Sequence, residues 1–189
     1  MKKEIINLPI GGRIGRLAKI IRDKTDLFTA EKVMKDFERY ESAKNNSEKA
    51  EWIKKMIQRL ENQIEINKCI EIMESCGNKC CGLSTRKQAK KLMEESNSLA
   101  EFIDKLNAKG IGGGRLQLED KKTIKGGYDR CYSGQVKQTK EPFPTNTYCQ
   151  CSVGWYKQFF QSVFQKDIEV ELMQSIITGA KTCEFIIHI

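Results

Sequence analysis

The chain has 189 residues, of which 39% are hydrophobic and 31% charged, and its formal net charge is +8. This composition excludes an intrinsically disordered chain, and no apolar run approaches the roughly 20 residues that cross a bilayer. The length suits one domain with a sizeable core, or one domain with a helical appendage.

The N-terminus and the charge pattern indicate where the protein is located and which partners to expect. The apolar stretch after Lys2 and Lys3 is broken by Asn7 and Pro9, so it lacks the core of a signal peptide. We therefore expect a cytoplasmic protein with no membrane segment, whose cysteines are reduced rather than paired in disulfides. The basic residues are interleaved with Glu and Asp along predicted helices, which is typical of a solvated face, so we do not expect a nucleic acid as a partner.

Residues 14–93 are predicted to form successive helices. Thr29 is the predicted N-cap of a helix whose apolar residues recur at helical spacing. Ser47 can start a longer helix that runs to about residue 75. Its apolar stripe faces either the core or a second chain, so a homodimer stays open. The stripe consists of Ile53, Met56, Ile57, Leu60 and Ile64.

A tight loop is predicted over residues 76–82, because two glycines and an asparagine there are typical of a helix end. A further helix begins near Ser84. Ser98 and Glu101 then form a capping-box pattern, which predicts another helix that closes at Gly110.

The composition shifts at residue 110, which divides a mostly helical region, 1–109, from an α+β region, 110–189. In the last strand Cys183 and Phe185 share one face. We predict an α+β fold, with N-terminal helices packed against a C-terminal antiparallel sheet in one compact domain. The predicted elements of the second region are strands at 115–119 and 128–133, a helix at 152–165, and strands at 167–177 and 182–189.

Seven cysteines are candidate metal ligands. Zinc takes four donors, mostly Cys and His. The single histidine, His188, falls on the strand face opposite Cys183, so a site here would consist of cysteines. Ligation by cysteine alone also suits an iron–sulfur cluster, which is the alternative cofactor. The candidates are Cys76, Cys80, Cys81, Cys131, Cys149, Cys151 and Cys183.

Two other interpretations of these cysteines stay open. The spacing is not that of a zinc ribbon, so several can be ordinary buried thiols, and we interpret Cys69 in that way. Cys149 and Cys151 lie near the start of a predicted helix, where the helix dipole favours a reactive thiolate.

The C-terminal residues suggest a family. Residues 149–155 (CQCSVGW), the helix that follows, and residues 168–186 with Gly179 and Cys183 resemble the 4-vinyl-reductase domain. The same pattern occurs in small bacterial proteins that resemble L-2-amino-thiazoline-4-carboxylic acid hydrolase. This resemblance implies an antiparallel sheet packed against helices around a small-molecule pocket.

The resemblance also implies positions for zinc ligands. Phenol-sensing relatives hold zinc with a cysteine before the helix, a glutamate on the next strand, a second cysteine three residues later and a terminal cysteine. Cys149 matches the first of these and Cys183 the last, whereas Leu172 and Ser175 stand at the other two positions, with Glu171 one step away. The additional cysteines could supply the missing ligands.

Three function classes follow from the sequence. The first is a small-molecule-binding or sensor-like protein with a Cys-ligated zinc. The second is a hydrolase or thiol-dependent enzyme, for which Asp129, Glu141 and Glu171 are scattered candidate bases. The third is an iron–sulfur protein.

Overall fold

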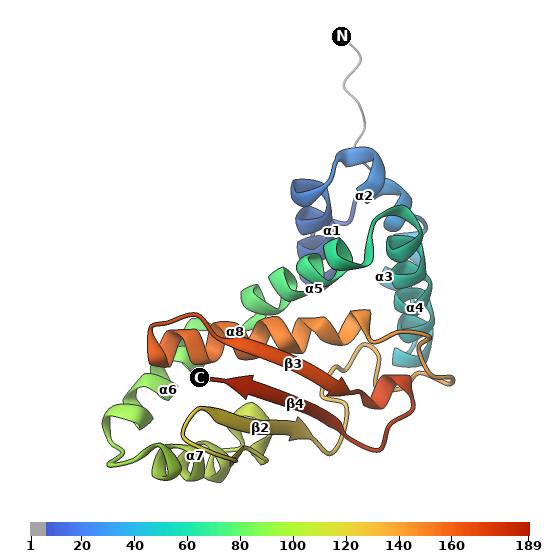
Figure 1. Cartoon of the computed structure of the whole chain (residues 1–189). Helices are drawn as coiled ribbons and strands as arrows, with labels where there is room; N and C mark the ends of the chain where they lie inside the picture. The colour runs from blue at the N-terminus through green and yellow to red at the C-terminus, as the bar shows by residue number, and fades with distance from the viewer. Residues whose placement is uncertain (1–6) are drawn as a thin grey trace. The chain divides into compact units, whose positions relative to one another are not determined.

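The computed structural model describes residues 7–189, which form eight α-helices and a four-stranded antiparallel sheet (Figure 1). The predicted α+β fold class is therefore confirmed. The chain divides into two compact units. The first comprises the residues up to Ile72 together with Gly134–Lys140, and the second comprises Met73–Ser133 and Glu141–Ile189. No helix of the described residues is long and apolar enough to span a membrane.

The helices of the first unit are capped by short polar side chains. The Asp26 carboxylate accepts the N–H of Thr29 at 2.8 Å, so Asp26 and not Thr29 is the N-cap of α2. Asn45, rather than Ser47, caps α4 by accepting the N–H of Glu48 at 3.0 Å. The elements are α1 (Gly12–Lys24), α2 (Leu27–Val33), α3 (Phe37–Glu41), α4 (Asn46–Gln63) and α5 (Ile66–Cys80), whose second half belongs to the second unit.

The predicted long helix is in fact two helices. Ile64 has extended backbone angles, which end α4 and let α5 start at Ile66. The predicted loop over 76–82 is also wrong, because α5 continues through Gly77 to Cys80. A Cβ on Gly77 would lie 1.9 Å from the carbonyl oxygen of Cys151 in α8. Gly77 thus permits a close helix crossing and does not end the helix.

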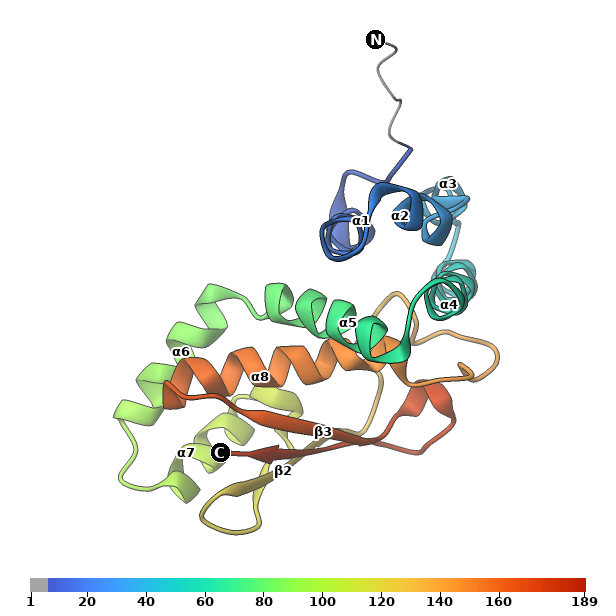
Figure 2. The ribbon, with the colours of Figure 1, turned by 45° about the horizontal axis from the view of Figure 1, so that its top comes forward.

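The second unit contains the sheet, in the strand order β1-β2-β4-β3. Helix α8 lies along one face of this sheet, as both views show (Figure 1 and Figure 2). The remaining elements are α6 (Leu83–Glu94), α7 (Leu99–Ala108), β1 (Gln117–Leu118), β2 (Thr123–Tyr128), α8 (Gln150–Phe164), β3 (Glu169–Gln174) and β4 (Cys183–His188).

The core of this unit lies between the sheet and α8. Cys183, Phe185 and Ile187 alternate inward along β4, as predicted. The ring of Phe185 lies 5.0 Å from that of Tyr156, which projects from α8. Tyr156 is fully buried, and its hydroxyl donates to the carbonyl of Gly112 at 2.8 Å.

Strand β2 was placed wrongly by the sequence, which favours 128–133. The strand is Thr123–Tyr128 and contains Gly126 and Gly127, residues that are rare in strands. Gly127 is needed because a Cβ there would lie 2.3 Å from the carbonyl oxygen of Cys183 on β4. Cys131 therefore lies beyond the end of the strand.

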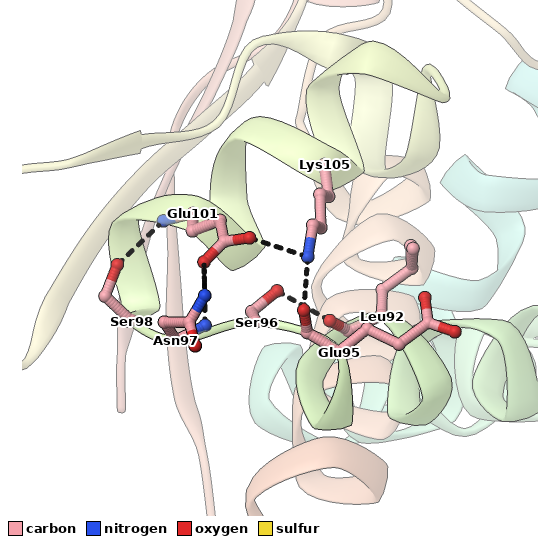
Figure 3. Close-up of polar contacts among 7 residues, drawn as sticks. All are labelled: Leu92, Glu95, Ser96, Asn97, Ser98, Glu101 and Lys105. Carbon is pink, nitrogen blue, oxygen red and sulfur yellow. Dashed lines mark hydrogen bonds and ion pairs between the residues drawn. The ribbon is translucent and has the colours of Figure 1, made fainter.

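The helix start predicted from Ser98 and Glu101 is confirmed, with the difference that the Glu101 carboxylate reaches the residue before the N-cap. The Ser98 hydroxyl accepts the N–H of Glu101 at 3.2 Å, and the Glu101 carboxylate accepts the N–H of Asn97 at 2.7 Å (Figure 3). Lys105 lies 2.8 Å from the same carboxylate. These partners lower the pKa of Glu101 to about 2, with Lys105 contributing most. The Ser98 hydroxyl thus pairs one of the first N–H donors of the helix.

Candidate functional site

Two of the predicted cysteines meet around a buried serine. Cys149 precedes α8, Ser175 follows β3, and Cys183 begins β4. The Cys149 Sγ lies 2.9 Å from the Ser175 Oγ, and the Cys183 Sγ accepts the N–H of Ile176 at 3.3 Å. All three side chains of this group are buried, Ser175 completely. The two cysteines that match the 4-vinyl-reductase pattern thus share one environment.

A local change of backbone brings Ser175 to this position. The β3–β4 register shifts between Leu172 and Gln174, and a short 3₁₀ turn, Ile176–Thr178, follows. The turn closes at Gly179, whose φ of +103° is a conformation that favours glycine. Strict alternation along β3 does not continue to Ser175, so a period-two pattern cannot predict where its hydroxyl points.

Two further thiols lie within electrostatic reach of Cys149. Negative charge on Cys151, Cys183 or Cys131 would raise the pKa of Cys149. Cys151 lies in the first turn of α8, and Cys131 lies in the segment after β2. Three separate segments of the second unit therefore bring three thiols within electrostatic reach of Cys149. We call Cys131, Cys149, Cys151 and Cys183 the thiol cluster.

Burial controls the protonation of these thiols. Desolvation raises the pKa of Cys149 far above its usual range and raises that of Cys183 as well, and hydrogen bonds from Ser175 offset only part of each shift. Both thiols are therefore protonated at neutral pH. A reactive thiolate at Cys149, as the helix start suggested, is not supported, because burial raises the pKa of this thiol.

The other predicted ligands have different surroundings. Cys76 and Cys80 lie on α5, and Cys81 follows it. Burial raises the pKa of Cys81 to about 11, and the charges acting on it come from Arg86 and Cys80 rather than from the thiol cluster. Metal ligation by these three cysteines stays a prediction. Cys69 is completely buried, as expected of a packing thiol.

The donors suit zinc in their chemistry but not in their present positions. Four thiols are a set that zinc binds readily. Within residues 7–189, however, no three Cys, His, Asp or Glu side chains are placed to hold one ion together. His188 pairs with Glu171 at 2.7 Å, on the strand face opposite Cys183. Zinc would require the thiols to lose their protons and turn to a common point, with Cys149 giving up Ser175.

Comparison with protein families gives one assignment. The model of a family of unknown function, DUF6144, matches residues 14–189. The chain belongs to DUF6144. The match spans both units, so the helical unit and the sheet unit are parts of one family pattern. No curated protein matched the DUF6144 chain. The family description assigns no activity, so the function has to be argued from the residues.

Proposed function

We propose that this DUF6144 protein binds a soft divalent cation, zinc, through the thiol cluster, and that it is a binding or sensor-like protein rather than a thiol-dependent enzyme. The observation that supports this is that three cysteines from three segments lie within electrostatic reach of the buried Cys149, which contacts Ser175. With four thiolate ligands the zinc would be closed to water, as in structural sites.

Electrostatics supports a cation at this position. A single buried thiolate is costly, and three neighbouring thiols make each further ionisation harder. A divalent cation offsets both costs, because metal binding replaces the thiol protons. The N–H of Ile176, which already points to the Cys183 Sγ, would also stabilise a thiolate there.

The test is metal analysis of the full chain, purified reductively without chelators. We expect one equivalent of zinc in the parent protein and loss of zinc in Cys149→Ser and Cys183→Ser. Cys69→Ser is the matched control, because Cys69 is equally buried but lies in the other unit. Cobalt substitution provides a second readout, since thiolate ligands give charge-transfer absorption.

Three outcomes would contradict the proposal. The first is a folded parent protein that contains no metal and takes up none when zinc is added. The second is equal zinc loss in Cys69→Ser and Cys149→Ser. The third is a brown protein with inorganic sulfide after anaerobic purification, which would establish the iron–sulfur alternative.

A further inference from the structure

A cavity of about 310 Å³ lies in the first unit, where α3 and α4 meet the segment Gly134–Lys140. This volume is at the lower end of the range for small-molecule sites. All the lining residues belong to this unit, so the cavity is independent of the thiol cluster. They are Asp36, Arg39, Ser47, Glu48, Glu51, Trp52, Lys55, Arg59 and Lys140.

The wall contains buried polar atoms without partners. The Trp52 side chain is only 6% exposed, and its Nε1 has no hydrogen-bond partner among the described residues. The Ser47 Oγ, five residues earlier on α4, is also buried and has no hydrogen-bond partner among the described residues. An indole N–H can only donate, and a buried donor without an acceptor is costly. A third unpartnered atom of this wall, Glu51 Oε1, is an acceptor and has Lys54 Nζ at 3.4 Å. The Trp52 and Ser47 atoms can both donate, so they suit a ligand that carries acceptor oxygens.

The acidic residues of the wall are already engaged. Glu48 accepts the N–H of Lys44 at 2.9 Å as part of the α4 cap. Glu51 Oε1 lies 3.4 Å from Lys54 Nζ, an ion pair without a hydrogen bond. The Asp36 carboxylate acts electrostatically on Arg59. Among the described residues, none of these three acids forms an ion pair with Arg39, Lys55 or Lys140.

Three cations of the wall have no ion pair among the described residues, namely Arg39, Lys55 and Lys140. Arg59 differs, because its guanidinium donates to the carbonyls of Val33 and Lys35 and lies 5.6 Å from the Trp52 ring. Arg59 is therefore held by the backbone and packs against Trp52, whereas the other three cations are available to a ligand. Three cations match a doubly charged group better than a single carboxylate.

We propose that this cavity binds a small phosphomonoester, whose phosphate is held by Arg39, Lys55 and Lys140 and whose oxygens accept from Trp52 Nε1 and Ser47 Oγ. The volume suits a phosphorylated metabolite of a few carbon atoms. The site requires no metal, so it stands whether or not the thiol cluster binds zinc.

The test uses the Trp52 indole N–H as a reporter in the NMR spectrum of the full ¹⁵N-labelled chain. The chain has two tryptophans, and the Trp52 signal is the one lost in Trp52→Phe. Glycerol phosphate is the probe, with succinate and chloride at matched ionic strength for comparison. We expect a saturable shift with glycerol phosphate, weaker binding of succinate and no saturable shift with chloride.

Variants connect the shift to the cavity. Lys55→Gln and Lys140→Gln should each weaken glycerol phosphate binding about tenfold, because each removes a charged hydrogen-bond donor. Lys137→Gln is the matched control, since Lys137 is exposed in the same segment but does not line the cavity. All three lysines are exposed, so folding should be unaffected. The proposal is overturned by the absence of a saturable shift, by tighter binding of succinate, or by equal effects of Lys137→Gln and Lys140→Gln.

Discussion

At the scale of single residues, Ser175 is the side chain that connects Cys149 with Cys183, although burial sets the protonation of both thiols. Its hydroxyl lies 2.9 Å from the Cys149 Sγ and lowers the pKa of both Cys149 and Cys183 against a larger effect of burial. The 4-vinyl-reductase resemblance places a ligand at this position, and the serine instead contributes a hydrogen bond. The sequence identified the position through its spacing from Cys183, but it did not predict the contact with Cys149.

Replacing Ser175 with alanine should destabilise the protein. The change leaves the buried Cys149 thiol without this hydrogen bond, so we expect the free energy of unfolding to fall by about 1 kcal/mol in urea titrations. The exposed Ser84→Ala is the control, with a change within about 0.5 kcal/mol. Equal stability of Ser175→Ala and the parent would show that the hydroxyl makes no useful contact.

Buried thiols should make the protein sensitive to alkaline pH. Burial raises the pKa of Cys69 and Cys81 from 9.0 to about 11. In the unfolded chain these thiols ionise near 9.0, whereas in the folded chain they keep their protons. Their contribution is therefore complete below pH 9.0 and is lost as the pH rises to about 11.

The measurement is the free energy of unfolding in urea across this pH range, for the parent and for Cys69→Ala. The other titrating groups are the same in both proteins, so only the difference between them reports on Cys69. We expect this difference to shrink as the pH rises. A constant difference would mean that Cys69 ionises equally in the folded and unfolded chains.

At the scale of elements, local patterns predicted the helices better than their ends. The Ser98 and Glu101 pattern gave the start of α7, because a capping box is a purely local signal. Gly77 was interpreted as part of a helix end, and the strand that contains Gly127 was placed too late in the chain. At both positions a backbone carbonyl from a distant part of the sequence lies so close that it leaves no room for a Cβ. No local pattern could therefore predict the roles of these glycines.

The crossing of α5 and α8 should tolerate no side chain at Gly154. A Cβ there would lie 1.9 Å from the carbonyl oxygen of Glu74 on α5. Alanine normally stabilises a helix more than glycine does. Here the steric overlap should instead make Gly154→Ala destabilising and lower the free energy of unfolding by about 1–3 kcal/mol. Gly134→Ala is the control, since no atom lies within 4 Å of its added Cβ. A Gly154→Ala variant as stable as the parent in urea would contradict this packing.

At the scale of the whole molecule, the sequence predicted the α+β class but not the division into units. The composition shift at residue 110 coincides with no unit boundary, since α5 passes from one unit to the other at Ile72 and Met73. The segment Gly134–Lys140 belongs to the helical unit, where Gln135 hydrogen-bonds Tyr40. A contact between residues so far apart in sequence cannot be predicted from hydrophobic periodicity, which is a local pattern.

Zinc should also stabilise the whole chain if the thiol cluster binds it, because unfolding separates the four cysteines. At a free zinc concentration about 100 times Kd, the free energy of unfolding should rise by about 2.7 kcal/mol. The gain should shrink as the pH falls, because protons compete with zinc for the thiolates. Thermal unfolding with and without zinc measures it. Cys69→Ser should keep the gain and Cys183→Ser should lose it, whereas an equal gain in both would locate the zinc elsewhere.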